Sequence, residues 1–364
     1  MNDRITRLAA RLEEKGLDAI LLPAPEQLSN VQVRYLTGFS GSSSYFLGAR
    51  SGPAWLLTDF RYVEAASADA DGYEVVRHER PYVTTLAQLV ADAGLRTVAF
   101  EAGHVPVAML DEWRRAMPEV DFQPAGRLME ELRIVKDAAE IAAIRRAAAL
   151  ADQALEELLP TIRGRREIDF AVALEHRMRE LGLEGPGFPT IVASGPRGSL
   201  PHAHPGERVV RDGDMVTVDF GGLSDGYRSD ETLTFGVGEV PARLREIFDL
   251  VHTAQAAGIA AVRPGIRASE VDRTCREIIA AAGYGDAFGH GTGHGVGLDV
   301  HERPFAARDP EPDRDDVLEP GMTLTVEPGI YLPGVGGARL EDTLVVTADG
   351  AERLTTVAKA WRSV

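Results

Sequence analysis

The stretch GHGTGHGVGLDVHE, residues 289–302, places three of the chain's nine histidines among five glycines. These are His290, His294 and His301. Histidine is the commonest metal ligand and a proton carrier near neutral pH, and glycine lets the backbone approach a ligand closely. A flexible polar turn would have the same composition, so the rest of the chain must decide between a site and a turn.

Carboxylates also occur where apolar strands are expected. In DMVTVDFGG, residues 214–222, alternation puts apolar side chains on one face and Asp219 on the other. Asp230 follows in YRSDETLTF, after the turn-rich segment GGLSDGY. The two strands can therefore pair antiparallel and bring Asp219 and Asp230 to one point.

The same pattern recurs near the end of the chain. Glu327 lies in TLTVEPGIYL and Glu341 in GARLEDTLVV, and turn residues around the intervening strand allow the two to be neighbours. Any one of the four carboxylates could be an exposed strand residue. Clustered carboxylates repel one another and raise one another's pKa unless a cation is present. Four carboxylates and one imidazole would suit a pair of divalent metal ions, which share bridging carboxylates.

The composition excludes several classes of protein. The net charge of −17 disfavours nucleic acid as a partner, because phosphate binding needs a basic face. The single cysteine, Cys275, cannot form an intrachain disulfide, and its helical context predicts a packed residue rather than a nucleophile. The N-terminal MNDRITRLAARLEEKG is amphipathic and charged, unlike a signal peptide. No apolar run is long enough to span a membrane, so we expect a cytoplasmic protein with no membrane partner.

The elements that must position these residues form two domains, 1–130 and 131–364. The first alternates helical and strand patterns, which is typical of an α/β domain. Helices are expected at 5–17, 81–95 and 106–117, and strands at 18–23, 45–49, 54–59 and 96–101. The second mixes helices with strands and glycine turns, which favours α+β. Its helices are expected at 136–162, 167–182, 244–262 and 268–283, and its strands at 190–195, 214–222, 226–236, 321–332 and 337–347.

The sequence resembles the pita-bread-fold metallopeptidases of family M24, which include aminopeptidase P, prolidase and methionine aminopeptidase. Four blocks look like the family's signatures: VDFGG with GYRSDETLTF, GHGTGHGVGLDVHE, TVEPGIY and ARLEDT. The segments YLTGFSGSSSYFL and LLTDFRY resemble the creatinase/prolidase-type N-terminal domain, which simple methionine aminopeptidases lack. The resemblance implies an α+β fold, with a smaller α/β N-terminal domain before a pita-bread catalytic domain, and favours the proline-specific branch.

The resemblance also implies a ligand set. Asp219 would chelate one metal ion, Asp230 and Glu341 would bridge both ions, and His294 and Glu327 would complete the second. A hydroxide between the ions would be the nucleophile, and Glu327 would help to handle its proton. Mn²⁺ is expected, with Co²⁺ or Zn²⁺ as alternatives.

Further catalytic roles are implied for residues around the metals. His202 would lie near the substrate carbonyl and matches the family motif better than His204, which is expected to be a polar loop residue. His301 would stabilise the tetrahedral intermediate, and His290 would line the prolyl side of the substrate. Arg339 would support a metal ligand or contact the substrate.

The implied reaction is hydrolysis of the amide bond between an N-terminal residue and proline, in X-Pro dipeptides or longer peptides. That amide has no N–H, so a metal site that polarises its carbonyl suits it. The resemblance also implies a homodimer. Hydrolysis of a small non-peptide amide and a catalytically inactive binding homologue stay open as alternatives.

Two residues depart from the family's pattern beside Asp230. Leu233 stands where the proline-specific enzymes often have an arginine, and Glu231 adds a charge. These departures put the electrostatics around Asp230, and the preferred substrate length, in doubt.

Overall fold

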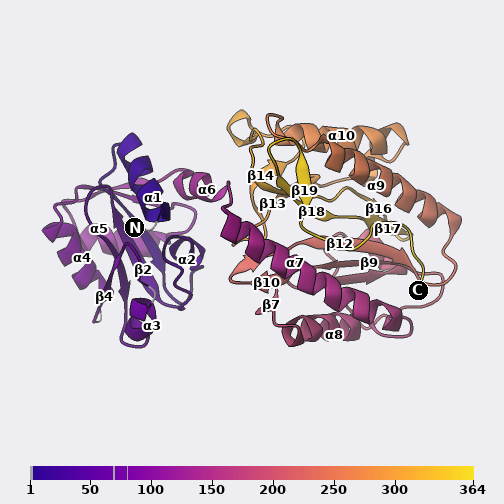
Figure 1. Cartoon of the computed structure of the whole chain (residues 1–364), viewed down its shortest axis with the longest axis horizontal. Coiled ribbons are helices and arrows are strands. Elements are labelled where there is room, and N and C mark those ends of the chain that lie inside the picture. The colour runs from indigo at the N-terminus through magenta and orange to yellow at the C-terminus, as the bar shows by residue number, and fades with distance from the viewer. Residues whose placement is uncertain (1–2, 69, 80) are drawn as a thin grey trace. The chain divides into compact units, whose positions relative to one another are not determined.

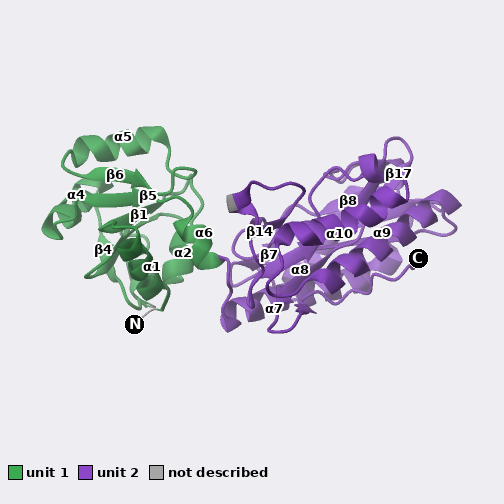
Figure 2. Ribbon diagram, turned by 90° about the horizontal axis from the view of Figure 1, so that it is seen from above, with its two compact units in different colours: residues 1–133 green, residues 134–364 purple. Residues whose placement is uncertain are grey.

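The structure is a computed structural model that describes residues 3–68, 70–79 and 81–364. The chain folds as two compact units, residues 1–133 and 134–364, which Figure 2 colours green and purple. The boundary expected from the sequence lies at residues 130 and 131.

Unit 1 is an α/β unit built on one six-stranded sheet in the order β4-β3-β2-β1-β5-β6. Its middle strands β1, β2 and β3 pair antiparallel, and the outer pairs are parallel. The strands are β1 (Ala19–Ala24), β2 (Ser44–Ala49), β3 (Ala54–Thr58), β4 (Glu74–Arg77), β5 (Thr97–Phe100) and β6 (Asp121–Pro124). The helices are α1 (Asp3–Glu14), α2 (Val31–Thr37), α3 (Val63–Ala68), α4 (Tyr82–Asp92), α5 (Val107–Ala116) and α6 (Leu128–Arg133).

The sequence pattern predicted the buried strands of unit 1 and missed the edge strands. All residues of β1, β2 and β3 are buried, so these strands are continuous apolar runs in the sequence. The edge strands β4 and β6 are partly exposed and contain charged or polar residues. Polar residues are common on edge strands because they discourage pairing with other chains, and they hide the strand signal.

The helices of unit 2 are α7 (Ala138–Leu158), α8 (Glu167–Glu180), α9 (Ala242–Ala261) and α10 (Ala268–Ala281). A capping box starts α7. The side chain of Asp137 accepts a hydrogen bond from the backbone N–H of Glu140, and the side chain of Glu140 accepts one from the backbone N–H of Asp137. Such a cap stabilises a helix by about 1 kcal/mol. Helix α7 packs against α8 and β10, and α9 packs against α10 and β17, as two helix pairs in Figure 1.

The strands of unit 2 form several small, antiparallel sheets. The three larger ones have the orders β12-β9-β8, β15-β18-β19 and β11-β10-β7, and β13-β14 and β16-β17 form pairs. The mixture of helices with antiparallel strands confirms the α+β class. The strands are β7 (Gly185–Pro186), β8 (Ile191–Ser194), β9 (Met215–Phe220), β10 (Gly222–Ser224), β11 (Tyr227–Arg228), β12 (Glu231–Gly236), β13 (Gly293–Gly295), β14 (Glu302–Ala306), β15 (Thr323–Val326), β16 (Gly329–Leu332), β17 (Gly336–Arg339), β18 (Asp342–Val346) and β19 (Ala351–Arg353).

Two segments expected as single strands, 226–236 and 337–347, are broken at candidate ligands, which the strand pattern did not predict, and a third, 321–332, is broken at Glu327, where the turn residues Pro328 and Gly329 had indicated a break. Strand β15 ends before Glu327 and β16 begins after Pro328, which has no N–H for a sheet ladder. Likewise β17 ends and β18 begins on either side of Glu341, and β12 begins after Asp230. The carboxylates thus lie at strand ends, where side chains from different sheets can meet.

Two exclusions made from the sequence have structural counterparts. In the described part of the chain, every helix is too short or too polar to cross a membrane. Cys275 is buried on α10, and its Sγ donates to the carbonyl oxygen of Ala254 at 3.3 Å. Burial raises the pKa of the thiol to about 12, which confirms that Cys275 is a packed residue.

Candidate functional site

One cavity of about 390 Å³ in unit 2 is lined by every residue that the sequence selected as a ligand or catalytic group. Its volume falls in the usual range for small-molecule sites. These residues are His202, Asp219, Asp230, His290, His294, His301, Glu327, Arg339 and Glu341. His204 is not among the lining residues.

Antiparallel pairing brings the four carboxylates together from distant parts of the sequence. In the β9–β12 pair, Asp219 lies opposite Thr232. Thr232 in turn forms an antiparallel β-bridge with Glu341. The backbone N–H of Glu341 donates to the carbonyl oxygen of Thr232 at 3.1 Å. The β15–β18 pair aligns Val326 with Asp342, which places Glu327 next to the same point. The site therefore forms where two sheets meet.

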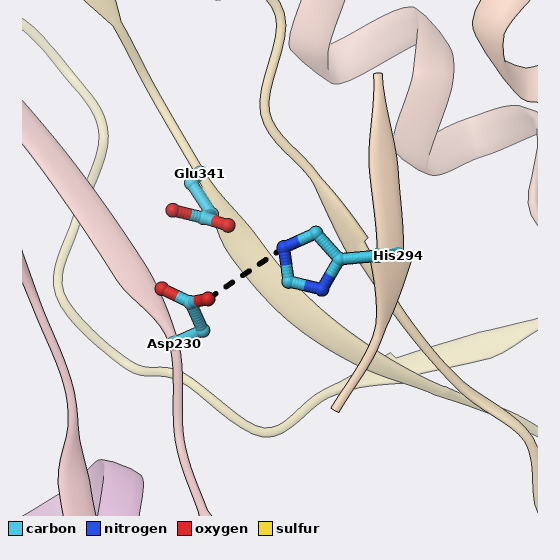
Figure 3. A group of neighbouring side chains, drawn as sticks. All are labelled: Asp230, His294 and Glu341. Atoms are coloured by element: carbon cyan, nitrogen blue, oxygen red, sulfur yellow. Dashed lines mark ion pairs between the residues drawn. The ribbon is translucent and has the colours of Figure 1, made fainter. Parts of the chain in front are cut away.

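Asp230, His294 and Glu341 form a compact group of potential metal ligands (Figure 3). All three are buried, and one ligand atom from each lies within 4.8 Å of the others. The Nε2 atom of His294 is 3.7 Å from Oδ2 of Asp230 and 3.4 Å from Oε1 of Glu327. These separations leave room for a cation among the four side chains.

The imidazole of His294 is oriented by its own backbone. Its Nδ1 donates to the carbonyl oxygen of Gly295 at 3.0 Å, so Nε2 is the ring atom that faces the carboxylates and would be available to a metal ion. The glycine before it is needed for close packing, because a Cβ on Gly293 would collide with the carbonyl oxygen of Thr325. Gly293 thus lets β13 approach β15.

Three buried carboxylate oxygens at the site have no hydrogen-bond partner. They are Oδ1 of Asp219, Oδ1 of Asp230 and Oε1 of Glu341. By contrast, Oε2 of Glu341 accepts from Thr232 Oγ1 at 2.6 Å, and Oδ2 of Asp219 accepts from Arg339 Nη2 at 2.5 Å. A buried, unpaired carboxylate oxygen is costly unless a cation compensates it. The residues present therefore fit a divalent metal ion.

The electrostatics of the site lead to the same conclusion. Burial, followed by the charge of Glu341, raises the pKa of Asp230 well above its usual value. Burial and the charge of Glu327 raise the pKa of Glu341 to about 8. Burial also acts on Glu327, but His294 and Arg339 outweigh it and lower the pKa of Glu327. The positively charged side chains of the protein thus compensate only part of the negative charge of the carboxylate cluster.

Arg339, Tyr331 and His290 form a hydrogen-bonded chain along one wall. Arg339 Nη1 donates to the Tyr331 hydroxyl at 2.8 Å, and that hydroxyl lies 2.9 Å from Nε2 of His290. Nδ1 of His290 faces the carbonyl oxygen of Gly291 at 2.7 Å, so Nε2 accepts the hydroxyl proton. Tyr331 was not predicted from the sequence. Its place in β16, the strand directly after Glu327, could have indicated that it lies near the site.

His202 and His301 are the exposed histidines of the cavity. The His301 ring lies 4.3 Å from the His294 ring, centroid to centroid. Partial burial and the charge of His294 lower the pKa of His301. A neutral imidazole beside the ligands can accept or donate a proton at the open side of the site.

The clustered carboxylates and histidine, their unpartnered oxygens and the surrounding cavity define a candidate metal centre in an α+β unit. The family model for metallopeptidase family M24 matches residues 142–348, and that for the creatinase/prolidase N-terminal domain matches residues 4–135. The chain belongs to metallopeptidase family M24. It is therefore a metallopeptidase with a pita-bread catalytic fold and a creatinase-type N-terminal domain.

Relatives and solved structures match over nearly the whole chain. The uncharacterized peptidase YqhT of Bacillus subtilis is 39% identical over 97% of each chain. An Xaa-Pro dipeptidase of Pyrococcus horikoshii is 32% identical over 98% of this chain and 97% of its own. The structure of an Xaa-Pro dipeptidase from Bacillus anthracis superimposes with a TM-score of 0.94 at 40% identity, covering 100% and 99% of the two chains. An X-Pro aminopeptidase from Thermotoga maritima gives a TM-score of 0.90 at 34% identity, covering 97% and 100%.

Proposed function

We propose that this metallopeptidase hydrolyses the amide bond between an N-terminal residue and proline. The observation that supports this most is the buried group of Asp230, His294 and Glu341 with its unpartnered carboxylate oxygens. The similar proteins named Xaa-Pro dipeptidase and X-Pro aminopeptidase support the substrate class.

Two divalent ions would be held by Asp219, Asp230, His294, Glu327 and Glu341. When bound, they would supply an activated water and polarise the scissile carbonyl. Oδ1 of Asp219 has no hydrogen-bond partner, whereas its Oδ2 accepts a hydrogen bond from Arg339, which would orient the carboxylate toward the ions. Oε1 of Glu341 likewise has no hydrogen-bond partner, whereas its Oε2 accepts a hydrogen bond from Thr232. Mn²⁺ as the native metal, a homodimer and a cytoplasmic location stay predictions.

The remaining cavity residues would bind the substrate and move protons. Glu327 would accept the proton of the attacking water and pass it to the proline nitrogen, whose amide lacks a proton of its own. His202 and His301, on the open side of the cavity, would donate hydrogen bonds to the oxygen that becomes negative in the transition state. His290 would line the prolyl side, held in place by Tyr331 and Arg339.

The test is a panel of substrates at a fixed Mn²⁺ concentration. X-Pro dipeptides, X-Pro tripeptides, longer X-Pro peptides and matched peptides with alanine in place of proline are compared. Release of the N-terminal residue from the proline substrates alone supports the proposal. A preference between dipeptides and longer peptides would identify the dipeptidase or aminopeptidase mode. Absence of hydrolysis across the panel, with metal bound, would favour a non-peptide amide substrate or an inactive homologue.

A further inference from the structure

The face of β12 that points away from the cavity contains Glu231, one of the two departures noted in the sequence. Thr232 and Thr234 face the site, since their hydroxyls donate to Glu341 and to the carbonyl oxygen of Arg339. Alternation therefore directs Glu231 and Leu233 to the opposite face. Leu233 packs in the apolar core, which leaves Glu231 as a buried charge within that core.

Lys359, in the segment after β19, neutralises this charge. Its ammonium donates to Oε1 of Glu231 and to the carbonyl oxygen of Val357, and it lies 3.5 Å from Oδ1 of Asp342. All three charged side chains are buried. Burial alone would lower the pKa of Lys359, but Glu231 and Asp342 outweigh it and raise that pKa, which favours the charged ammonium.

The two carboxylates that share Lys359 are direct sequence neighbours of two candidate metal ligands. Glu231 follows Asp230 at the start of β12, and Asp342 follows Glu341 at the start of β18. Asp342 is held further by Thr355 Oγ1 at 2.8 Å and by Gln255 Nε2 at 3.0 Å. One ammonium thus contacts the residues directly behind both ligands.

The segment that contains Lys359 is fixed along β12. The N–H of Gly236, the last residue of β12, donates to the carbonyl oxygen of Arg362, and Val364 N–H donates back to Gly236, both at 3.0 Å. Trp361 packs edge-on against Phe248 of α9. On the N-terminal side of Lys359, the backbone N–H and the hydroxyl of Thr356 both donate to Asp152 of α7. Lys359 is therefore held in position rather than free to move.

We propose that Lys359 is a positioning residue for the metal centre: by contacting both Glu231 and Asp342, it fixes the separation of the Asp230 and Glu341 carboxylates. This inference rests on the proposed function, because it takes Asp230 and Glu341 as metal ligands. Lys359 itself lies outside the cavity lining and acts through its two neighbours.

The test compares the wild-type chain with Lys359→Met and with the double variant Lys359→Met/Glu231→Gln. The measurements are the Mn²⁺ dissociation constant by titration calorimetry, the visible absorption spectrum of the Co²⁺-loaded protein, and the melting temperature. The control is Arg208→Met, which removes another ion pair of unit 2, with Asp214 at 2.6 Å, whose residues do not line the cavity.

Lys359→Met should weaken Mn²⁺ binding about 10-fold and change the Co²⁺ spectrum, as expected for loss of a residue that orients metal ligands. The double variant lacks the uncompensated Glu231 charge, so it should regain melting temperature while its Mn²⁺ binding stays weak. Arg208→Met should lower the melting temperature and leave Mn²⁺ binding unchanged.

Wild-type Mn²⁺ affinity and Co²⁺ spectrum in Lys359→Met would overturn the inference, and so would recovery of both affinity and stability in the double variant. If Lys359→Met does not fold, the double variant alone gives the comparison with wild type. A wild-type chain that binds no metal would overturn the proposed function, and this inference with it, before any variant is measured.

Discussion

Buried carboxylates lie on both faces of the strands around the cavity, but their surroundings differ. On the cavity face, Asp230 and Glu341 are buried with unpartnered oxygens. On the opposite face, their sequence neighbours Glu231 and Asp342 contact the ammonium of Lys359. The protein supplies a lysine to Glu231 and Asp342, whereas among the described residues neither Asp230 nor Glu341 forms an ion pair with a lysine or arginine, which leaves these two carboxylates for a metal.

The largest effect is expected for Glu341→Gln on the cavity face. Loss of a ligand should cost more than the 10–100-fold that loss of an outer partner costs, so kcat/KM should fall by more than about 100-fold and metal content should fall with it. The melting temperature of the metal-free protein should rise, because the substitution removes repulsion among buried carboxylates.

On the opposite face of the strands, a substitution should lower the melting temperature of the metal-free protein. Lys359→Met should destabilise the metal-free protein by about 3–5 kcal/mol, the usual cost of removing one partner of a buried ion pair. Equal shifts of the melting temperature for Glu341→Gln and Lys359→Met would contradict the distinction between the two faces.

His301→Ala should lower kcat by about 100-fold, the cost of removing a hydrogen-bond donor to a developing oxyanion, while metal content stays at the wild-type level. His204→Ala is the matched control, because His204 does not line the cavity, and its kinetics should be unchanged. A parallel loss of metal in His301→Ala would show that His301 supports a ligand instead of the transition state.

Tyr331→Phe should have a smaller effect of about 5-fold on kcat/KM, in line with a net hydrogen-bond contribution of about 1 kcal/mol. The hydroxyl connects Arg339 to His290, and its removal lets His290 turn away from the substrate. Steady-state kinetics on an X-Pro dipeptide measure the change, and a larger loss with longer substrates would move the role of Tyr331 to substrate length selection.

The smallest effect concerns pH and the metal-free protein. The pKa of Glu341 is raised from its ordinary value of 4.5 to about 8 in the folded protein. The folded state thus binds this proton more tightly than the unfolded state, and stability should fall as pH rises between these values. Melting temperatures measured in EDTA from pH 5 to 8 should fall by a few degrees, and Glu341→Gln or saturating Mn²⁺ should flatten the trend.

The sequence predicted much of the site because its signals are local. Asp219 stands out in an alternating strand pattern, and the histidines stand out among glycines between 289 and 302. What could not be predicted depends on contacts between distant segments: Thr232 with Glu341, 109 residues apart, and Lys359 with Glu231, 128 residues apart. The strand break at Glu341 also escaped prediction, because the apolar pattern continues across that position.

We propose that five side chains, in strands or at strand ends, surround a pair of divalent ions: Asp219, Asp230, His294, Glu327 and Glu341. X-ray diffraction from Mn²⁺-soaked crystals, recorded at the manganese absorption edge, tests it most directly. The account predicts two anomalous peaks about 3.5–4 Å apart, both in contact with Asp230 and Glu341. A map with no peak between those carboxylates, or with its manganese elsewhere, would contradict it.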